Sequence, residues 1–201
     1  MREHEINKLD NFICGWYIDD TSICDDLIEH HKNSNDKSPG TVAFKGKSEI
    51  IPKVKESTDV VLIDENLVNR YAESLSNACD LYIEKYPWVV GYDTFTIIEY
   101  INIQHYRPGG GYFSWHTERT TDKFPISTRH MVFMTYLNDV SDGGETEFYH
   151  QKLKVKPEKG LTIIWPADWT FTHRGVVSPS QDKWIITGWY NFCSNLNNEV
   201  N

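Results

Sequence analysis

Apolar positions recur every three or four residues between Asp64 and Tyr86, in the segment DENLVNRYAESLSNACDLYIEKY. This spacing predicts one face of an amphipathic α-helix, and Pro87 ends it because proline cannot continue the backbone hydrogen bonding. The apolar face consists of Leu67, Tyr71, Leu75, Ala78, Tyr82 and Tyr86. A shorter helix is predicted through ICDDLIEHHK, with Asp20 or Thr21 as its N-cap, and the polar stretch NSNDKSPG after it is expected to be a loop.

After Pro87 the pattern changes to short runs rich in β-branched and aromatic residues. Four such runs are TFTIIEYINIQHY, MVFMTYL, LTIIW and KWIITGWYNF, which Gly, Pro, Asn or Asp separate. They predict strands, and several strands in succession without helical patterns between them predict a sandwich or barrel. We therefore expect a single α+β domain over residues 1–201. Its helical N-terminal part (1–90) would pack against an antiparallel β core (about 91–193), followed by a short polar tail (194–201).

Composition narrows the classes of protein. The chain has 201 residues, of which 39% are hydrophobic, so it is long enough to bury a core. A formal charge of −9 without a long Lys/Arg run argues against a nucleic-acid partner. No run approaches the roughly 18–20 apolar residues that would span a membrane, and the N-terminal MREHEINKLDNF lacks the apolar core of a signal peptide. We therefore expect no membrane partner. The four cysteines lack CxxC spacing, so a cytoplasmic location with reduced thiols is expected.

Three potential metal ligands stand out: the pair His116 and Glu118, and His173 further along the chain. Residues i and i+2 of an extended strand point to one face, so His116 and Glu118 can converge on one ion, and a histidine from a facing strand can complete a triangle. Two imidazoles and one carboxylate that leave open positions are typical of non-haem Fe(II) oxygenases. Taken alone, the pair is better explained as a surface histidine beside a solvated glutamate, because the chain has 8 histidines and 29 acidic residues.

The surrounding sequence is more specific than the triplet. Five blocks occur in order: QHYRPGGGYFSWHTE, RHMVFMTYLNDV, GGETEF, VKPEKGLTIIW and HRGVVSPSQDKWIITGWY. Together they resemble the prolyl 4-hydroxylase-like branch of the 2-oxoglutarate/Fe(II) dioxygenase superfamily. The resemblance implies a double-stranded β-helix (jelly-roll, cupin-like) core with the N-terminal helices packed against it. It also implies Fe(II), with 2-oxoglutarate and O2 as cosubstrates and L-ascorbate as an accessory reductant.

The same resemblance assigns roles to further residues. Lys183, ten residues after His173, matches the basic residue that pairs with the far carboxylate of 2-oxoglutarate. Tyr106, ten residues before His116, matches a tyrosine whose hydroxyl contacts the cosubstrate. Tyr136 is a second candidate for the pocket wall. Arg129 and Trp189 are candidates for the substrate side. The aromatic residues also fit core packing, and Arg129 also fits a structural ion pair.

Two positions depart from the family's usual pattern. Glu118 stands where most relatives have aspartate, and its extra methylene requires the strand or the rotamer to adapt. Val132 stands where many relatives have threonine, so the cosubstrate pocket is expected to have its own hydrogen-bond pattern. A carboxylate at position 118 favours hydroxylation over halogenation, because the related halogenases have glycine or alanine there.

The resemblance implies hydroxylation of a substrate C–H bond, with release of succinate and CO2. A prolyl residue in a peptide or protein is the first hypothesis for the substrate. A free amino acid or other small-molecule substrate is the alternative within the enzyme class. A non-catalytic, cupin-like module that binds a metal or ligand is the alternative outside it.

Overall fold

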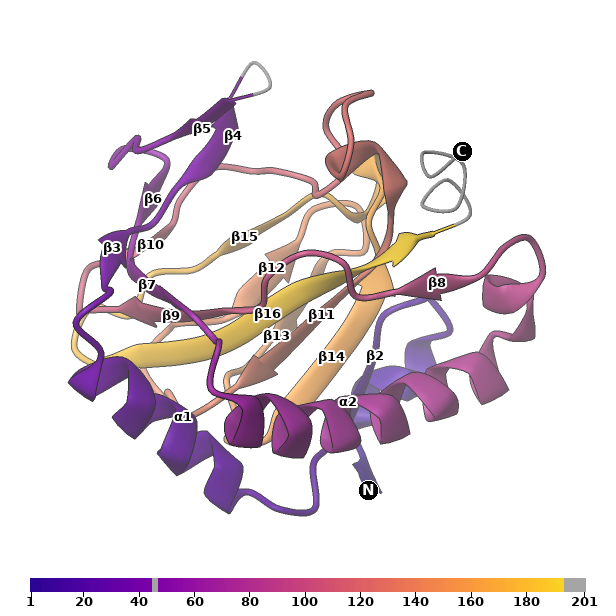
Figure 1. Cartoon of the computed structure of the whole chain (residues 1–201), viewed down its shortest axis with the longest axis horizontal. Coiled ribbons are helices and arrows are strands. Elements are labelled where there is room, and N and C mark those ends of the chain that lie inside the picture. Colours follow the sequence, from indigo (N-terminus) through magenta and orange to yellow (C-terminus); the bar gives the residue numbers. More distant parts are fainter. Residues whose placement is uncertain (45–46, 194–201) are drawn as a thin grey trace.

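The computed structural model of the chain describes residues 1–44 and 47–193, and the expected polar tail, 194–201, lies outside the described residues. Two helices, α1 (Ser22–Asn33) and α2 (Glu65–Lys85), lie side by side along one face of the main sheet (Figure 1). Four short 3-10 helices connect other elements: Glu5–Leu9, Pro87–Val90, Ile126–Thr128 and Trp169–Phe171.

The main sheet is antiparallel and has nine strands. Eight follow the order β1-β2-β14-β11-β16-β9-β7-β3, and β8 pairs with the end of β16. Their bounds are β1 Arg2–Glu3, β2 Cys14–Tyr17, β3 Ser38–Pro39, β7 Thr58–Val61, β8 Phe95–Thr96, β9 Asn102–Tyr106, β11 Arg129–Tyr136, β14 Leu161–Pro166 and β16 Lys183–Phe192.

A second layer covers the face of the main sheet that is turned away from the helices (Figure 1). It contains the sheet β13-β12-β15 and the pair β10-β6, and the hairpin β4-β5 extends from its edge. Their bounds are β4 Val42–Phe44, β5 Lys47–Glu49, β6 Lys55–Glu56, β10 Gly111–Tyr112, β12 Thr146–Phe148, β13 Leu153–Val155 and β15 His173–Gly175. Two facing antiparallel layers of this kind form a jelly roll, which agrees with the expected fold class.

The central strand β11 shows why both faces of the main sheet are apolar. Its side chains alternate between the faces, as they do in any strand. Phe133 is buried against the helices, whereas Val132 and Met134 are buried in the space between the two layers. The Tyr71 hydroxyl of α2 lies 2.9 Å from Thr135 Oγ1, so the contact between helix and sheet also includes a buried hydrogen bond.

Most predicted elements are confirmed. The long helix is α2, and the Asp64 side chain caps it by accepting a hydrogen bond from Leu67 N at 3.0 Å. The four β-rich runs form β8 with β9, β11, β14 and β16. The N-terminal 90 residues are not purely helical, however, because β2 pairs with β14 and β7 pairs with β9. These strands have four residues each, too few for their alternation to stand out in the sequence.

No helix within the described ranges combines the length and the hydropathy that a membrane crossing requires.

Candidate active site

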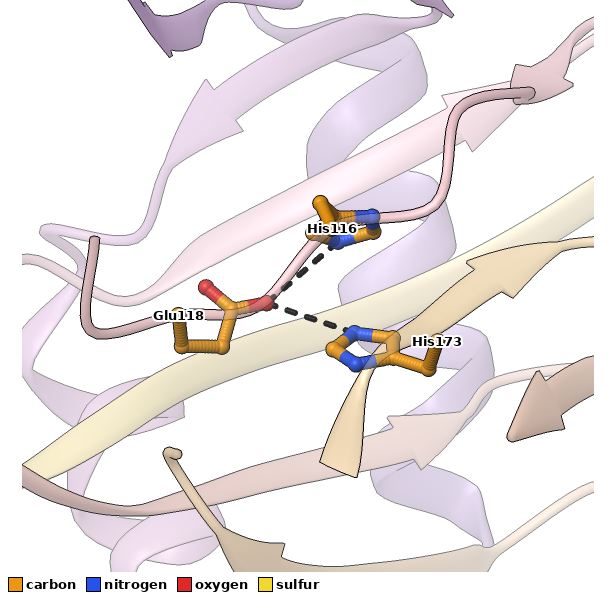
Figure 2. Close-up of side chains that lie close together, drawn as sticks. All are labelled: His116, Glu118 and His173. Atoms are coloured by element: carbon orange, nitrogen blue, oxygen red, sulfur yellow. Dashed lines mark ion pairs between the residues drawn. The ribbon is translucent and has the colours of Figure 1, made fainter. Parts of the chain in front are cut away.

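His116, Glu118 and His173 converge in the space between the two layers (Figure 2). Their potential ligand atoms all lie within 4.8 Å of one another. His173 begins β15 and pairs directly with His116, and the two residues exchange backbone hydrogen bonds of 2.9 Å. The second histidine therefore comes from an adjacent segment, not from a facing strand as expected. Within the described chain, only His116 of the HxE segment has strand pairing and Glu118 lies at a bend, so this segment is not a regular strand.

Both imidazole rings are oriented by the backbone. Nδ1 of His116 lies 3.1 Å from Ser114 O, and Nδ1 of His173 lies 2.9 Å from Phe171 O. Because a carbonyl oxygen only accepts hydrogen bonds, each Nδ1 carries a proton, and each Nε2 is left to face the cluster. The Tyr112 ring stacks on the His116 ring at 3.6 Å between centroids and further restricts its orientation.

Glu118 presents one carboxylate oxygen to both rings. Its Oε1 lies 3.5 Å from His116 Nε2 and 3.3 Å from His173 Nε2. Burial alone would raise the pKa of Glu118, but hydrogen bonds and charge interactions with the two histidines hold it well below its usual value. Burial, together with the neighbouring His173, lowers the pKa of His116. The surroundings thus favour an ionised carboxylate at Glu118.

This arrangement fits Fe(II). The donor set is two imidazole Nε2 atoms and one carboxylate oxygen on a single face, the combination that leaves positions open for further ligands on the metal. The two Nδ1–H groups are already satisfied, so metal binding would leave no buried donor unpaired. The structure therefore brings together the three residues that the sequence singled out as metal ligands.

Lys183, the first residue of β16, lines the same cavity as the three potential ligands. The cavity has a volume of about 330 Å³, within the range of small-molecule sites. The Lys183 ammonium is buried and donates to Gly144 O at 2.6 Å, but no carboxylate of the described residues forms an ion pair with it. Burial lowers the pKa of Lys183 to about 8. A buried cation with no carboxylate in direct contact fits the far carboxylate of 2-oxoglutarate.

The two tyrosines occupy different depths. Tyr106 lines the cavity, and its hydroxyl donates to Gln104 Oε1 at 2.7 Å. Tyr136 is fully buried and lies behind Thr146, which itself lines the cavity. The Tyr136 hydroxyl lies 2.7 Å from Thr146 Oγ1 and 3.2 Å from Val155 O, so its hydrogen bonds are made within the protein. Tyr106 thus faces the site directly, whereas Tyr136 supports the residue in front of it.

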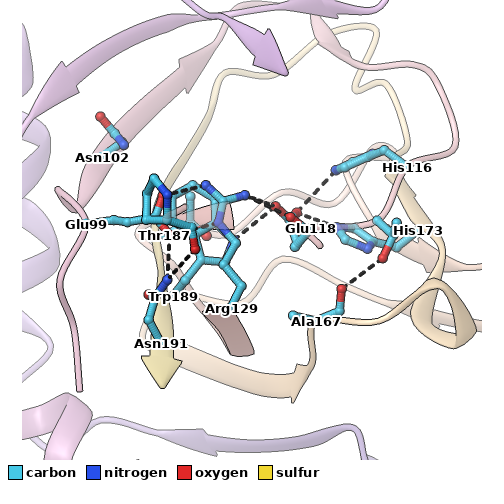
Figure 3. A network of polar contacts seen from close by, with 12 residues as sticks. Glu99, Asn102, His116, Glu118, Arg129, Ala167, His173, Thr187, Trp189 and Asn191 are labelled. Atoms are coloured by element: carbon cyan, nitrogen blue, oxygen red, sulfur yellow. Dashed lines mark hydrogen bonds and ion pairs between the residues drawn. The ribbon is translucent and has the colours of Figure 1, made fainter. Parts of the chain in front are cut away.

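Arg129 and Trp189 both line the cavity, and both contact Glu118 (Figure 3). Trp189 Nε1 donates to Glu118 Oε2 at 3.0 Å, and Arg129 Nη1 donates to the Glu118 backbone oxygen at 3.0 Å. Glu99 forms a salt bridge with Arg129 at 2.6 Å. The two residues that the sequence assigned to the substrate side therefore also surround a potential metal ligand.

Two residues of the site were not singled out in the sequence. Lys55 on β6 is buried in the cavity wall and forms a 2.7 Å ion pair with Asp59. Thr146 opens β12 and lines the cavity near Lys183. Val132, where many relatives have threonine, is buried in the core between the layers. The Thr146 hydroxyl accepts a hydrogen bond of 2.7 Å from the Tyr136 hydroxyl.

Comparisons with known proteins agree with this geometry. The family model described as the 2OG-Fe(II) oxygenase superfamily matches residues 101–191. No curated protein matches the chain significantly.

Several solved structures share the fold. A prolyl hydroxylase from Trichoplax adhaerens, in complex with a hypoxia inducible factor oxygen degradation domain peptide fragment, has a TM-score of 0.72 and 17% identity, covering 93% of this chain and 87% of that one. A Pseudomonas putida prolyl-4-hydroxylase has a TM-score of 0.68 and 14% identity, covering 94% and 97%. The viral collagen prolyl hydroxylase of Paramecium Bursaria Chlorella virus-1, in its 2OG complex, has a TM-score of 0.66 and 18% identity, covering 92% and 98%. Residues 101–191, which match the 2OG-Fe(II) oxygenase superfamily, contain the His-Glu-His cluster, and the chain as a whole has the fold of these prolyl hydroxylase structures.

Proposed function

We propose that this oxygenase hydroxylates a prolyl residue in a peptide or protein, with His116, Glu118 and His173 as its Fe(II) ligands and Lys183 as the anchor of 2-oxoglutarate. The observation that carries the proposal is the convergence of the three ligand atoms within 4.8 Å in a cavity that also holds an unpaired, buried ammonium. The three ligand atoms suit a ferrous ion, and the buried ammonium suits a dicarboxylate. A cavity with both features is suited to a reaction that uses Fe(II) and 2-oxoglutarate together.

When Fe(II), 2-oxoglutarate and O2 are bound, they supply oxidative decarboxylation of the cosubstrate to succinate and CO2, coupled to hydroxylation of a C–H bond. The protein contributes binding and orientation. Lys183 holds the far carboxylate in place, and this fixes which end of the cosubstrate reaches the metal ligands. Tyr106 places its hydroxyl, which donates to Gln104 Oε1 at 2.7 Å, in the wall of the same cavity, and burial raises its pKa and keeps the phenol protonated.

The walls of the cavity limit access of water. Apolar side chains of Met134, Trp165 and Ile185 line it from three strands of the main sheet. Val42 and Ser48 of the β4-β5 hairpin line it from the other side. An apolar lining around a few polar groups orients a ligand and excludes bulk solvent from the reacting atoms.

The choice of a prolyl residue is supported by the solved structures that share the fold. Those proteins are described as prolyl hydroxylases, one of them as a collagen prolyl hydroxylase and one in complex with a peptide fragment. The cavity of about 330 Å³ has room for a small residue beside the cosubstrate.

The test begins with metal-free protein under anaerobic conditions. Addition of Fe(II) and 2-oxoglutarate should produce the weak visible charge-transfer band of a chelated ferrous site, and a folded protein without this band would refute the assigned site. O2 and ascorbate are then added with a panel of proline peptides, free amino acids and nucleosides, and succinate and hydroxylated product are measured. Product from proline peptides alone supports the proposal. Product from a free amino acid and not from the peptides would instead support a small-molecule hydroxylase.

A further inference from the structure

We infer that Trp189 and Arg129 are positioning residues for Glu118, and that their contacts fit this metal site to glutamate in place of the shorter aspartate. The inference rests on the proposed role of Glu118 as a metal ligand. It accounts for the one ligand position at which the chain departs from the common pattern.

The two carboxylate oxygens of Glu118 have separate environments (Figures 2 and 3). Oε1 faces the two histidine rings, at 3.5 Å from His116 Nε2 and 3.3 Å from His173 Nε2. Oε2 points the other way, and accepts a hydrogen bond of 3.0 Å from Trp189 Nε1. Arg129 Nη1 lies 3.5 Å from the same Oε2. One oxygen is therefore free for a metal ion, while the other is held by the protein.

Arg129 also holds the backbone of the ligand. Its Nη1 donates to the Glu118 carbonyl oxygen at 3.0 Å, so the guanidinium contacts both the main chain and the side chain of one residue. The Trp189 ring lies against the guanidinium, with 3.5 Å between Cζ and the ring centroid. The indole and the guanidinium thus stabilise one another as well as Glu118.

Glu99 fixes the far side of the guanidinium. Its two carboxylate oxygens accept from Arg129 Nε at 2.8 Å and from Nη2 at 2.6 Å, in a bidentate pair. Asn191 Nδ2 donates to Glu99 Oε1 at 3.0 Å. Asn191 and Trp189 are two residues apart on β16, so they project from the same face of that strand. The end of β16 therefore contacts both Glu99, through Asn191, and Glu118, through Trp189.

The geometry suits a glutamate. Replacing it with aspartate removes one methylene and withdraws the carboxylate by about 1.5 Å, the length of one C–C bond. Trp189 Nε1 and the histidine Nε2 atoms lie on opposite sides of the carboxylate, so a shorter side chain cannot reach both. If it binds the metal, it loses the indole; if it keeps the indole, it leaves the metal. Because Oε2 accepts the hydrogen bond of Trp189, Oε1 is the oxygen that would be available to a bound metal ion.

The experiment uses Co(II) as a probe and contains no substrate, so contacts of Trp189 or Arg129 with substrate do not contribute. Co(II) affinity is measured by calorimetry, and the visible d–d spectrum reports the ligand geometry. The variants are Trp189→Phe, which keeps the ring and removes only the N–H donor, Glu118→Asp, and the two combined. The matched control is Trp184→Phe. Trp184 is on the same strand, and its buried Nε1 has no hydrogen-bond partner among the described residues.

Trp189→Phe is expected to weaken Co(II) binding about tenfold and to shift the d–d spectrum, as removal of a contact to a metal ligand does. Glu118→Asp is expected to weaken it by about 10–100-fold. The double variant should match Glu118→Asp alone, because the aspartate no longer reaches the indole. Trp184→Phe should bind like the wild type.

Two results would overturn the inference alone: a Trp189→Phe protein with wild-type affinity and spectrum, or losses that multiply in the double variant. Thermal unfolding of the metal-free variants confirms that each is folded before titration. If the folded wild-type protein binds neither Co(II) nor Fe(II), the proposed metal site fails and this inference fails with it.

Discussion

Replacing each of the two buried lysines of the cavity by methionine is expected to change the stability of the protein in opposite directions. Lys183 and Lys55 are both nearly inaccessible to solvent, at 6% and 4% exposure. Lys55 forms an ion pair with Asp59 at 2.7 Å. Lys183 donates its hydrogen bond to the Gly144 carbonyl and lies near the rings of Tyr106 and Tyr136, but no carboxylate of the described chain is within ion-pair distance. Methionine has a similar length and flexibility without the charge, so it removes the ammonium and largely keeps the packing.

The magnitude for Lys183 follows from its pKa, which burial lowers from 10.5 to about 8. One unit corresponds to about 1.4 kcal/mol, so a charged Lys183 costs the metal-free protein about 3 kcal/mol at neutral pH. The substitution Lys183→Met also removes the hydrogen bond to Gly144 O, and this loss offsets about 1 kcal/mol of the gain in stability. Lys183→Met should therefore raise the free energy of unfolding by about 2 kcal/mol, or the melting temperature by about 4–8 °C. Lys55→Met should lower the free energy of unfolding by about 3 kcal/mol, because it leaves the Asp59 carboxylate without its partner.

The gain in stability from Lys183→Met should decrease as the pH rises. Between pH 8 and pH 10.5, approximately, the unfolded wild-type chain binds more protons at Lys183 than the folded protein does. The stability of the wild-type protein therefore rises with pH in this window. The advantage of Lys183→Met should accordingly be complete below pH 8 and disappear near 10.5. Urea denaturation of the metal-free proteins at pH 7 and pH 10 measures it.

The same substitution should impair function. Without the ammonium, the far carboxylate of 2-oxoglutarate would be buried without a counter-charge, which costs at least about 2 kcal/mol, or about thirtyfold in affinity. Anaerobic titration of the charge-transfer band measures this affinity, with Fe(II) affinity determined in parallel. A Lys183→Met protein that binds 2-oxoglutarate like the wild type, or that loses as much stability as Lys55→Met, would refute the reasoning.

Three further outcomes are expected. Fe(II) or Co(II) at 100 times its dissociation constant should stabilise the chelator-treated protein by about 2.7 kcal/mol, and Glu118→Ala should abolish this gain in thermal unfolding; an equal gain in the variant would count against the ligand. Phe133→Ala should cost about 3–5 kcal/mol in urea denaturation, because the ring is fully buried between sheet and helices, and a loss below about 1 kcal/mol would contradict that packing. Gly143→Ala should cost clearly more stability than Gly109→Ala, because both have positive φ but only the first places a Cβ at 2.3 Å from Val177 O; equal costs would disprove the clash.

The sequence by itself determined the local elements. The three-to-four-residue spacing between Leu67 and Tyr82 defines the buried face of α2, because that period is set by the geometry of one helix. The β-branched runs mark β11, β14 and β16 for the same local reason. The HxE pair and the lysine ten residues after His173 lie in short blocks, so they were recognisable as a candidate site without knowledge of the fold.

The tertiary structure alone decided which distant residues meet. His173 joins His116 through an antiparallel bridge between segments 57 residues apart, and no local period encodes that pairing. Trp189 and Arg129 hold Glu118 because the end of β16 lies beside the start of β11. Lys183 and Lys55 look alike in the sequence, yet only Lys55 has a carboxylate partner. Burial and charge pairing arise from contacts between segments that fold together, so they become visible only when the fold brings those segments into place.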